Sequence, residues 1–166
     1  MRALRRLLPV VIALVVAVGL VLRAGEDDTL PPSHATVVRA VDGDTIVVRL
    51  PSGTEERVRY VGIDTPESVK PGTPVQCFAK AASDANAALV EGRRVRLVRD
   101  VSERDRYGRL LAYVYRDDDD LLVNEELVRQ GYAHATPYPP DVRYESRFRT
   151  LEREAREASR GLWKAC

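Results

Sequence analysis

The chain has few of the residues on which transition-metal and redox centres depend. Its 166 residues include two histidines, His34 and His134, and two cysteines, Cys77 and Cys166. A His-rich transition-metal site is therefore not expected, and a metal bound here should have hard oxygen ligands. The sequence also has no internal repeat and no low-complexity segment, which argues against solenoid and disordered architectures.

Net positive charge is lacking as well. The formal net charge is +1, but four of the 26 basic residues lie in the first 25 positions, where there is no acidic residue. The remaining 22 basic residues face 25 acidic ones, so residues 26–166 carry a net charge of −3. Such a domain does not coat nucleic acid by bulk charge. If it binds a polyanion, it uses a local arginine cluster or a metal.

The N-terminus has the pattern of a targeting segment. Arg2, Arg5 and Arg6 precede an uncharged, mostly aliphatic run over residues 7–22, and Arg23 follows it. Residues 1–25 are therefore expected to be an uncleaved signal-anchor helix or a cleaved signal peptide. The basic flank keeps the N-terminus cytoplasmic, so residues 26–166 should be extracytoplasmic, anchored to the membrane or secreted.

The two cysteines form an even pair. In an exported protein such a pair predicts a disulfide, here between Cys77 and Cys166, and two free thiols are the alternative. The bridge would tie the C-terminus to the middle of the chain.

The order of elements predicts a small barrel. Residues 26–34 form a polar linker, and residues 35–166 form the folded domain. Strand patterns cover residues 36–41, 46–50, 57–63, 94–99 and 110–115, and helical patterns cover residues 77–90, 122–130 and 143–160. The order β-β-β-α-β-β-α-α defines a predominantly β, α+β fold. It fits a five-stranded OB-fold barrel with three helices.

Two short acidic motifs mark the ends of one predicted hairpin. Asp44 lies in Asp-Gly-Asp-Thr before its first strand, and Asp64 lies in Asp-Thr-Pro-Glu after its second. In an antiparallel pair, facing residue numbers have a constant sum, here about 105 to 108 for a turn near residues 52–54. Asp44 and Asp64 sum to 108. The two carboxylates are therefore predicted to meet, which requires a cation between them.

The oxygen ligands favour Ca²⁺ or Mg²⁺ at this site. Thr65 could add its backbone carbonyl, and Glu67 is placed to orient or deprotonate a water beside the metal. Each motif alone also has a structural interpretation, because Asp-Gly is a common turn and Asp-Thr-Pro-Glu resembles a helix start. Their meeting across one hairpin favours the functional interpretation.

Two arginines could supply the positive charge of a phosphate site. Arg59 lies in the second hairpin strand, and Arg109 begins the fifth predicted strand. Arginine forks match the free oxygens of a phosphate, although a single arginine is more often a solvated side chain. Strict alternation places Arg59 and Asp64 on opposite faces of their strand, so a bulge or bend near Gly62 is predicted.

Taken together, these motifs resemble the staphylococcal (micrococcal) nuclease family. The similarity spans about residues 35–163, with Asp-Gly-Asp-Thr, Arg-x4-Asp-Thr-Pro-Glu, Asp-x-Tyr-Gly-Arg-x-Leu-Ala-Tyr and Val-Asn-Glu-x-Leu-Val-Arg-Gln-Gly in the family's order and spacing. The resemblance implies a sugar-nonspecific, Ca²⁺-dependent endonuclease that hydrolyses DNA or RNA phosphodiesters. The 5′-oxygen would leave, giving 3′-phosphate products.

The resemblance also implies a role for each site residue. Asp44, Asp64 and the Thr65 carbonyl would bind Ca²⁺. Arg59 and Arg109 would hold the scissile phosphate, and Glu67 would act on the attacking water. The implied contacts to the rest of the substrate come from Arg106, where the founding nuclease has a lysine, from Tyr107, and from Tyr138 as the candidate for a second substrate tyrosine.

Three functional interpretations remain at this stage. The first is an exported nuclease, expected to be a monomer that meets the membrane only through its N-terminal segment. The second is an OB-fold nucleic-acid-binding module without catalysis, which would be expected to lack at least one of the site residues. The third is a Ca²⁺-stabilised surface domain, which gives no reason for both arginines. The complete set of residues favours the nuclease.

Overall fold

The structure is a computed structural model, and it describes residues 33–67, 72 and 74–166. The predicted targeting segment, residues 1–25, and nearly all of the predicted linker lie outside the described residues. Within them, no helix has the length and apolar character needed to cross a membrane.

Five strands close into a barrel, as the sequence predicted. They are β1 (Ser33–Ala40), β2 (Thr45–Arg49), β3 (Glu55–Tyr60), β5 (Arg94–Val98) and β6 (Leu110–Arg116). The order around the barrel is β1-β2-β3-β6-β5, with β5 pairing back to β1 and with a parallel pairing only between β3 and β6. This is the OB-fold barrel. Its interior is filled by β-branched and aromatic side chains such as Ile46, Val58 and Tyr113.

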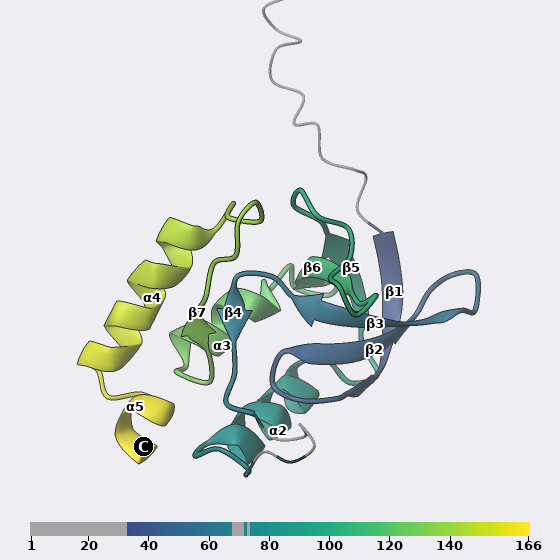
Figure 1. The fold of residues 1–166 in the computed structure, drawn as a ribbon. Coiled ribbons are helices and arrows are strands. Elements are labelled where there is room, and N and C mark those ends of the chain that lie inside the picture. Colours follow the sequence, from purple (N-terminus) through teal and green to yellow (C-terminus); the bar gives the residue numbers. More distant parts are fainter. Residues whose placement is uncertain (1–32, 68–71, 73) are drawn as a thin grey trace, which may run out of the picture.

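In the described part of the chain, four helices lie outside the barrel. They are α2 (Ala79–Val90), α3 (Val123–Arg129), α4 (Glu145–Glu157) and the short α5 (Leu162–Ala165). Figure 1 shows α4 and α5 on one side of the barrel and α2 at its lower end. The three predicted helices are confirmed, but α4 is shorter than the predicted span of residues 143–160. The chain leaves the helix at Ser159, whose φ is 49°, and α5 follows as a separate turn.

The hairpin register corrects one prediction. Facing residues of β2 and β3 sum to 104, as in the pair Thr45 and Arg59, because the turn is centred on residue 52. The residue opposite Asp44 is therefore Tyr60, whose N–H donates to the Asp44 carbonyl at 2.9 Å. The prediction that Asp64 faces Asp44 within this ladder was wrong, since β3 already ends at Tyr60.

Asp64 reaches the site by a bend instead. Gly62 has a φ of 79°, and after it a two-residue strand, β4 (Ile63–Asp64), pairs with β7 (His134–Ala135). The predicted bend at Gly62 is confirmed. A side chain on Gly62 would also meet the Phe148 ring at 3.0 Å, so α4 packs directly on the bend.

The polar side chain of Asn124 fixes this bend from the other side. Its amide, buried in α3, donates to the Val61 carbonyl at 2.9 Å and accepts from the Val114 N–H at 2.9 Å. The amide thus ties α3 both to β6 and to the segment that carries Asp64. Removing such a doubly bonded buried group would leave two backbone groups unpaired.

The predicted disulfide is present. Cys77, just before α2, is bonded to Cys166 at the end of α5, with a Cα–Cα distance of 6.0 Å and a sequence separation of 89 residues. In the chain-entropy model a loop of this length stabilises the fold by about 4 to 5 kcal/mol as an upper value. The bridge also holds the C-terminus against the residues that precede α2.

Candidate phosphate and metal site

Arg59 joins the two acidic motifs. Its Nε lies 3.2 Å from Oδ1 of Asp44, and its Nη2 donates to Oδ1 of Asp64 at 2.8 Å. Its Nη1 donates to the carbonyls of Tyr60 at 2.7 Å and Ile63 at 2.9 Å, which the bend turns toward it. The Arg59 side chain is only 17% exposed. The bend therefore resolves the conflict with strand alternation and brings both carboxylates to one cation.

The second oxygen of Asp44 binds the start of the other motif. Its Oδ2 accepts from the backbone N–H of Thr65 at 2.9 Å and from the Thr65 hydroxyl at 3.0 Å. Asp44 and Thr65 are both buried. Gly43 is required here, since a Cβ on it would lie 2.6 Å from the Thr65 hydroxyl oxygen. The two motifs thus interlock through buried hydrogen bonds.

Glu67 is held through its backbone. Its N–H donates to the side-chain oxygen of Gln76 at 2.8 Å, and its carbonyl accepts from the Gln76 N–H at 3.0 Å. Gln76 precedes the disulfide-bonded Cys77. This two-bond clamp fixes the backbone of Glu67 beside the acidic pair.

A small cleft of about 190 Å³ collects these groups. Its walls include Asp42, Asp44, Arg59, Asp64, Thr65, Glu67 and Arg109. The structure therefore brings together every residue that the sequence analysis assigned to metal binding or catalysis.

Arg109 reaches the cleft from the loop before β6. Its Nε donates to Oδ2 of Asp105 at 2.7 Å, while its backbone N–H donates to the other oxygen of the same carboxylate at 3.0 Å. Burial alone would raise the pKa of Asp105, but the hydrogen bonds from Arg109 and from the Tyr107 backbone lower it below its usual value. Asp105 thus stays ionised and fixes the Arg109 guanidinium.

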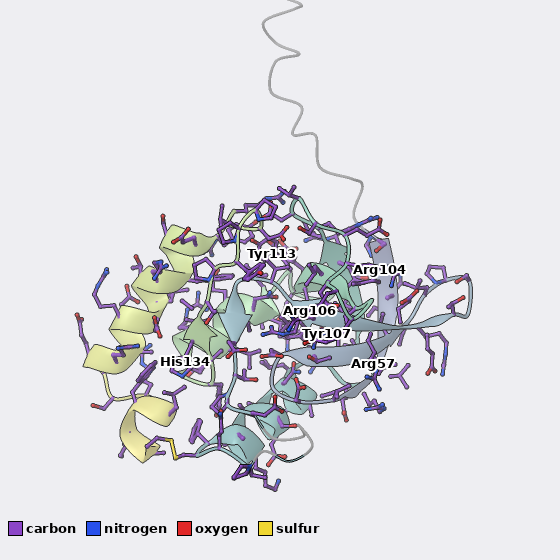
Figure 2. The ribbon with its side chains drawn as sticks, in the orientation of Figure 1. Arg57, Arg104, Arg106, Tyr107, Tyr113 and His134 are labelled. Atoms are coloured by element: carbon purple, nitrogen blue, oxygen red, sulfur yellow. A yellow bond between two sulfur atoms is a disulfide. The ribbon has the colours of Figure 1, made fainter. Side chains whose placement is uncertain are left out.

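A larger cleft of about 550 Å³ adjoins the small one and shares Arg59 and Arg109 with it. The predicted substrate contacts Arg106, Tyr107 and Tyr138 line it. Figure 2 shows Arg106 and Tyr107 next to each other, and the Arg106 carbon Cζ lies 4.8 Å from the centre of the Tyr107 ring. Tyr107 and Tyr138 are 68% and 79% exposed, so their rings are available to a ligand.

The carboxylates of the small cleft carry excess negative charge. Burial and the neighbouring Asp44 carboxylate raise the pKa of Asp42 from 3.8 to about 6. Burial also raises the pKa of Asp64, and the opposing effect of Arg59 does not cancel it. Even with Arg59 present, the site therefore has carboxylate charge to share with a further cation.

The donor set fits a hard divalent cation held by few protein ligands. Asp44 and Asp64 meet at one guanidinium, so they can also meet at one metal ion. Among residues 33–67, 72 and 74–166, no three His, Cys, Asp or Glu side chains converge as a complete metal cage. Such a two-carboxylate site needs waters or substrate oxygens to complete the coordination of Ca²⁺ or Mg²⁺.

The raised pKa of Asp42 predicts a pH dependence of stability in the metal-free protein. The folded state holds this proton to a higher pH than the unfolded chain, so the contribution is present below pH 3.8 and is lost as the pH rises through about 6. Asp42→Asn keeps an oxygen that accepts from the Asp44 N–H but cannot ionise. In chelator, it should be more stable than the wild type at pH 8 by about 1 to 3 kcal/mol, and equal to it at pH 4.

Urea unfolding of both proteins at pH 4 and pH 8 measures this difference. Effects of carboxylates that do not interact with Asp42 cancel, because they are common to the two proteins. An equal difference at both pH values would contradict the assigned origin of the shift.

Sequence reasoning missed three residues of this site. Asp42 adds to the negative charge, Asp105 orients Arg109, and Gln76 holds Glu67. Asp42 and Asp105 lie inside the recognised motifs, two residues before Asp44 and four before Arg109, so the spacing could have identified them. Gln76 carried no such signal, because nine positions separate it from Glu67.

Fold and site together define a class: an OB-fold barrel with a cleft that joins paired carboxylates to paired arginines. Comparison with known proteins agrees. The family model described as "Staphylococcal nuclease homologue" matches residues 57–165. The chain belongs to the staphylococcal nuclease family.

Several curated relatives resemble most of the chain. It is 41% identical over 127 residues to a thermonuclease of Staphylococcus hyicus, covering 76% of this chain and 73% of that protein. A thermonuclease of Staphylococcus intermedius is 42% identical over 128 residues, covering 77% and 74%. Endonuclease YncB of Bacillus subtilis (strain 168) is 42% identical over 132 residues, covering 78% of this chain and 61% of that protein.

Proposed function

We propose that this protein is a Ca²⁺-dependent nuclease that hydrolyses phosphodiester bonds of DNA, RNA or both. The 5′-oxygen leaves, and the products carry 3′-phosphates. The observation that carries the proposal is the small cleft, in which Arg59 and Arg109 face the carboxylates of Asp44, Asp64 and Glu67. Family membership supports the nuclease activity itself.

In this proposal Asp44 and Asp64 hold Ca²⁺, with the carbonyl of Thr65 as a third ligand. When bound, the ion supplies positive charge for the phosphate oxygens and a place for a water ligand. Thr65 also has a second role, because its N–H and hydroxyl fix the orientation of the Asp44 carboxylate. The fixed orientation reduces the cost of collecting two like charges at one point.

The arginines stabilise the charge that builds up on the phosphorus oxygens. Arg59 is anchored by two backbone carbonyls and Arg109 by Asp105, so both forks are positioned before the substrate arrives. Preorganised donors of this kind need no rearrangement in the transition state. Glu67, positioned by Gln76, accepts a proton from the attacking water.

The larger cleft takes the nucleotide next to the scissile bond. Arg106 and Tyr107 meet a neighbouring phosphate, and Tyr138 offers a ring on the opposite wall. These contacts position the substrate without touching the reacting atoms. They are expected to affect binding more than turnover.

The alternative is a binding module of the same fold without catalysis. It is disfavoured because no member of the site is missing and because Gln76 and Asp105 hold Glu67 and Arg109 in place. A module that only bound nucleic acid would have no use for a positioned carboxylate beside the phosphate site.

The proposed location is outside the cytoplasm. The Cys77–Cys166 disulfide supports an oxidising compartment, which agrees with the targeting pattern of residues 1–25. We also propose that the protein is a monomer. It is either attached to the membrane through its N-terminal segment or released when that segment is cleaved.

Digestion of plasmid DNA and of RNA by the purified protein tests the function. Cleavage is expected in millimolar Ca²⁺ and should stop when a chelator is added, then resume when Ca²⁺ is restored. No cleavage in Ca²⁺ would refute the proposal. Undiminished cleavage in chelator would refute its metal dependence.

A further inference from the structure

The outer face of β1, β2 and β3 carries arginines that the proposed active site does not use. Cross-strand pairing aligns Arg39 of β1 with Val47 of β2, and Val47 with Arg57 of β3. The next row toward the active site aligns Thr45 with Arg59. Arg57 is thus two residues from Arg59 on one strand, a distance of about 6.7 Å.

A bulge in β1 contributes to this arrangement. The register shifts between Val37 and Arg39, so the extra residue Val38 and then Arg39 are both exposed, whereas Val37 and Ala40 pack on the core. Without the bulge, one of these two positions would point inward. The bulge therefore places Arg39 in the row with Arg57.

These two guanidiniums have no counter-ion. In the part of the chain that the structure describes, Arg39 and Arg57 are exposed and form no ion pair or side-chain hydrogen bond. Their neighbours differ in this respect: Arg49, one row further from the site, is paired with Glu55 at 2.7 Å, and Arg104 is paired with Glu56 at 3.0 Å. In a domain with net negative charge, two uncompensated arginines beside the site form a local anion-binding surface.

Val47 shows what covers this face. It is only 7% exposed, although it points away from the core residues Ile46 and Val48. Its cross-strand neighbours are Arg39 and Arg57, whose aliphatic stems can lie over it while their charged ends remain in water. In Figure 2, Arg57 lies over the barrel strands in the same part of the view as Arg106 and Tyr107.

We infer that Arg39 and Arg57 bind backbone phosphates of a nucleic-acid strand that continues beyond the scissile bond. The inference rests on the proposed function and extends it: the preferred substrate is a polynucleotide several residues long. The distance of about 6.7 Å between Arg57 and Arg59 along β3 is comparable with the distance between neighbouring phosphates of an extended strand. None of the side chains in these rows is aromatic, so the contacts are electrostatic and independent of base sequence.

The test uses a double variant that carries both Arg39→Gln and Arg57→Gln. It is compared with the wild-type chain. Glutamine keeps part of the stem over Val47 and removes the charge. Steady-state cleavage is measured on a 30-nucleotide single-stranded DNA and on a dinucleotide. Arg49→Gln is the matched control, since it removes an arginine of the same face whose charge is already neutralised.

The double variant should have a KM for the long substrate raised roughly 10- to 30-fold at 0.1 M salt, with kcat unchanged. Cleavage of the dinucleotide should be unaffected. The slope of log KM against log salt should fall by about 1.4, the value for two phosphate contacts on a single strand. Arg49→Gln should match the wild type in its KM for the long substrate, in its cleavage of the dinucleotide and in its salt slope.

An unchanged KM and salt slope for the long substrate would overturn the inference, as would an equal loss on the dinucleotide. Failure of the proposed function is distinguishable, because the wild type would then cleave neither substrate. In that case fluorescence anisotropy with the labelled 30-nucleotide DNA decides. A weaker affinity of the double variant with a reduced salt slope supports phosphate binding by Arg39 and Arg57, and equal affinities refute it.

Discussion

Arg109→Ala should lower turnover by at least about 100-fold and leave the fold intact. Arg109, like Arg59, lines both clefts, so it can reach a phosphate held between the nucleotide site and the acidic pair. Its side chain is 27% exposed and its guanidinium is held by Asp105, which means that its orientation is set before substrate binds. The loss should therefore be in kcat, since the interaction is strongest with the charge of the transition state.

Arg149→Ala is the matched control. Arg149 forms an ion pair with Glu145, four residues before it, on the exposed surface of α4. Arg109 and Asp105 have the same spacing. Its loss should change neither kcat nor thermal stability beyond the small contribution of a surface pair. Single-turnover cleavage of a labelled oligonucleotide measures both variants. An Arg109→Ala protein with near-normal turnover would remove Arg109 from the catalytic set.

Glu67→Ala should have an effect of similar size, at least about 100-fold on turnover, for a different reason. Its backbone remains clamped by Gln76, and Cys77 remains bonded to Cys166, so residue 67 keeps these two anchors when the carboxylate is removed. The water then loses the group that accepts its proton. Substrate affinity should change little, because a carboxylate does not attract a phosphate.

Glu67→Gln distinguishes chemistry from packing. Glutamine has nearly the same shape but cannot take the proton, so it should be as impaired as the alanine variant. Glu154→Ala, which removes an exposed carboxylate on α4, serves as the control for loss of charge. Retention of more than half of the wild-type rate by Glu67→Gln would show that Glu67 is not the base.

The barrel and most of the residues that line the small cleft could be predicted because their signals are local. Alternating strands and the two acidic motifs each lie within a short stretch of sequence. The disulfide followed from an even cysteine count in a chain with a targeting pattern. The meeting of Asp44 and Asp64 was also predicted, but by the wrong route.

The true route depends on contacts that no short window contains. Asp64 is placed by the pairing of β4 with β7, which joins residues about 70 positions apart, and by the packing of Phe148 on Gly62. The contact between Arg59 and Asp64 depends on the Tyr60 and Ile63 carbonyls, which converge only after the bend. The role of Gln76 likewise depends on hydrogen bonds with a residue nine positions away, which local propensity does not encode.

The chemical identity of the product ends tests the central claim most directly. A single-stranded DNA and an RNA of the same sequence are digested in millimolar Ca²⁺, and the new ends are identified by mass spectrometry and by phosphatase sensitivity. Departure of the 5′-oxygen predicts 3′-phosphate and 5′-hydroxyl ends from both substrates, with no products in chelator. Ends with 5′-phosphates, or cleavage that persists without the metal, would contradict the account.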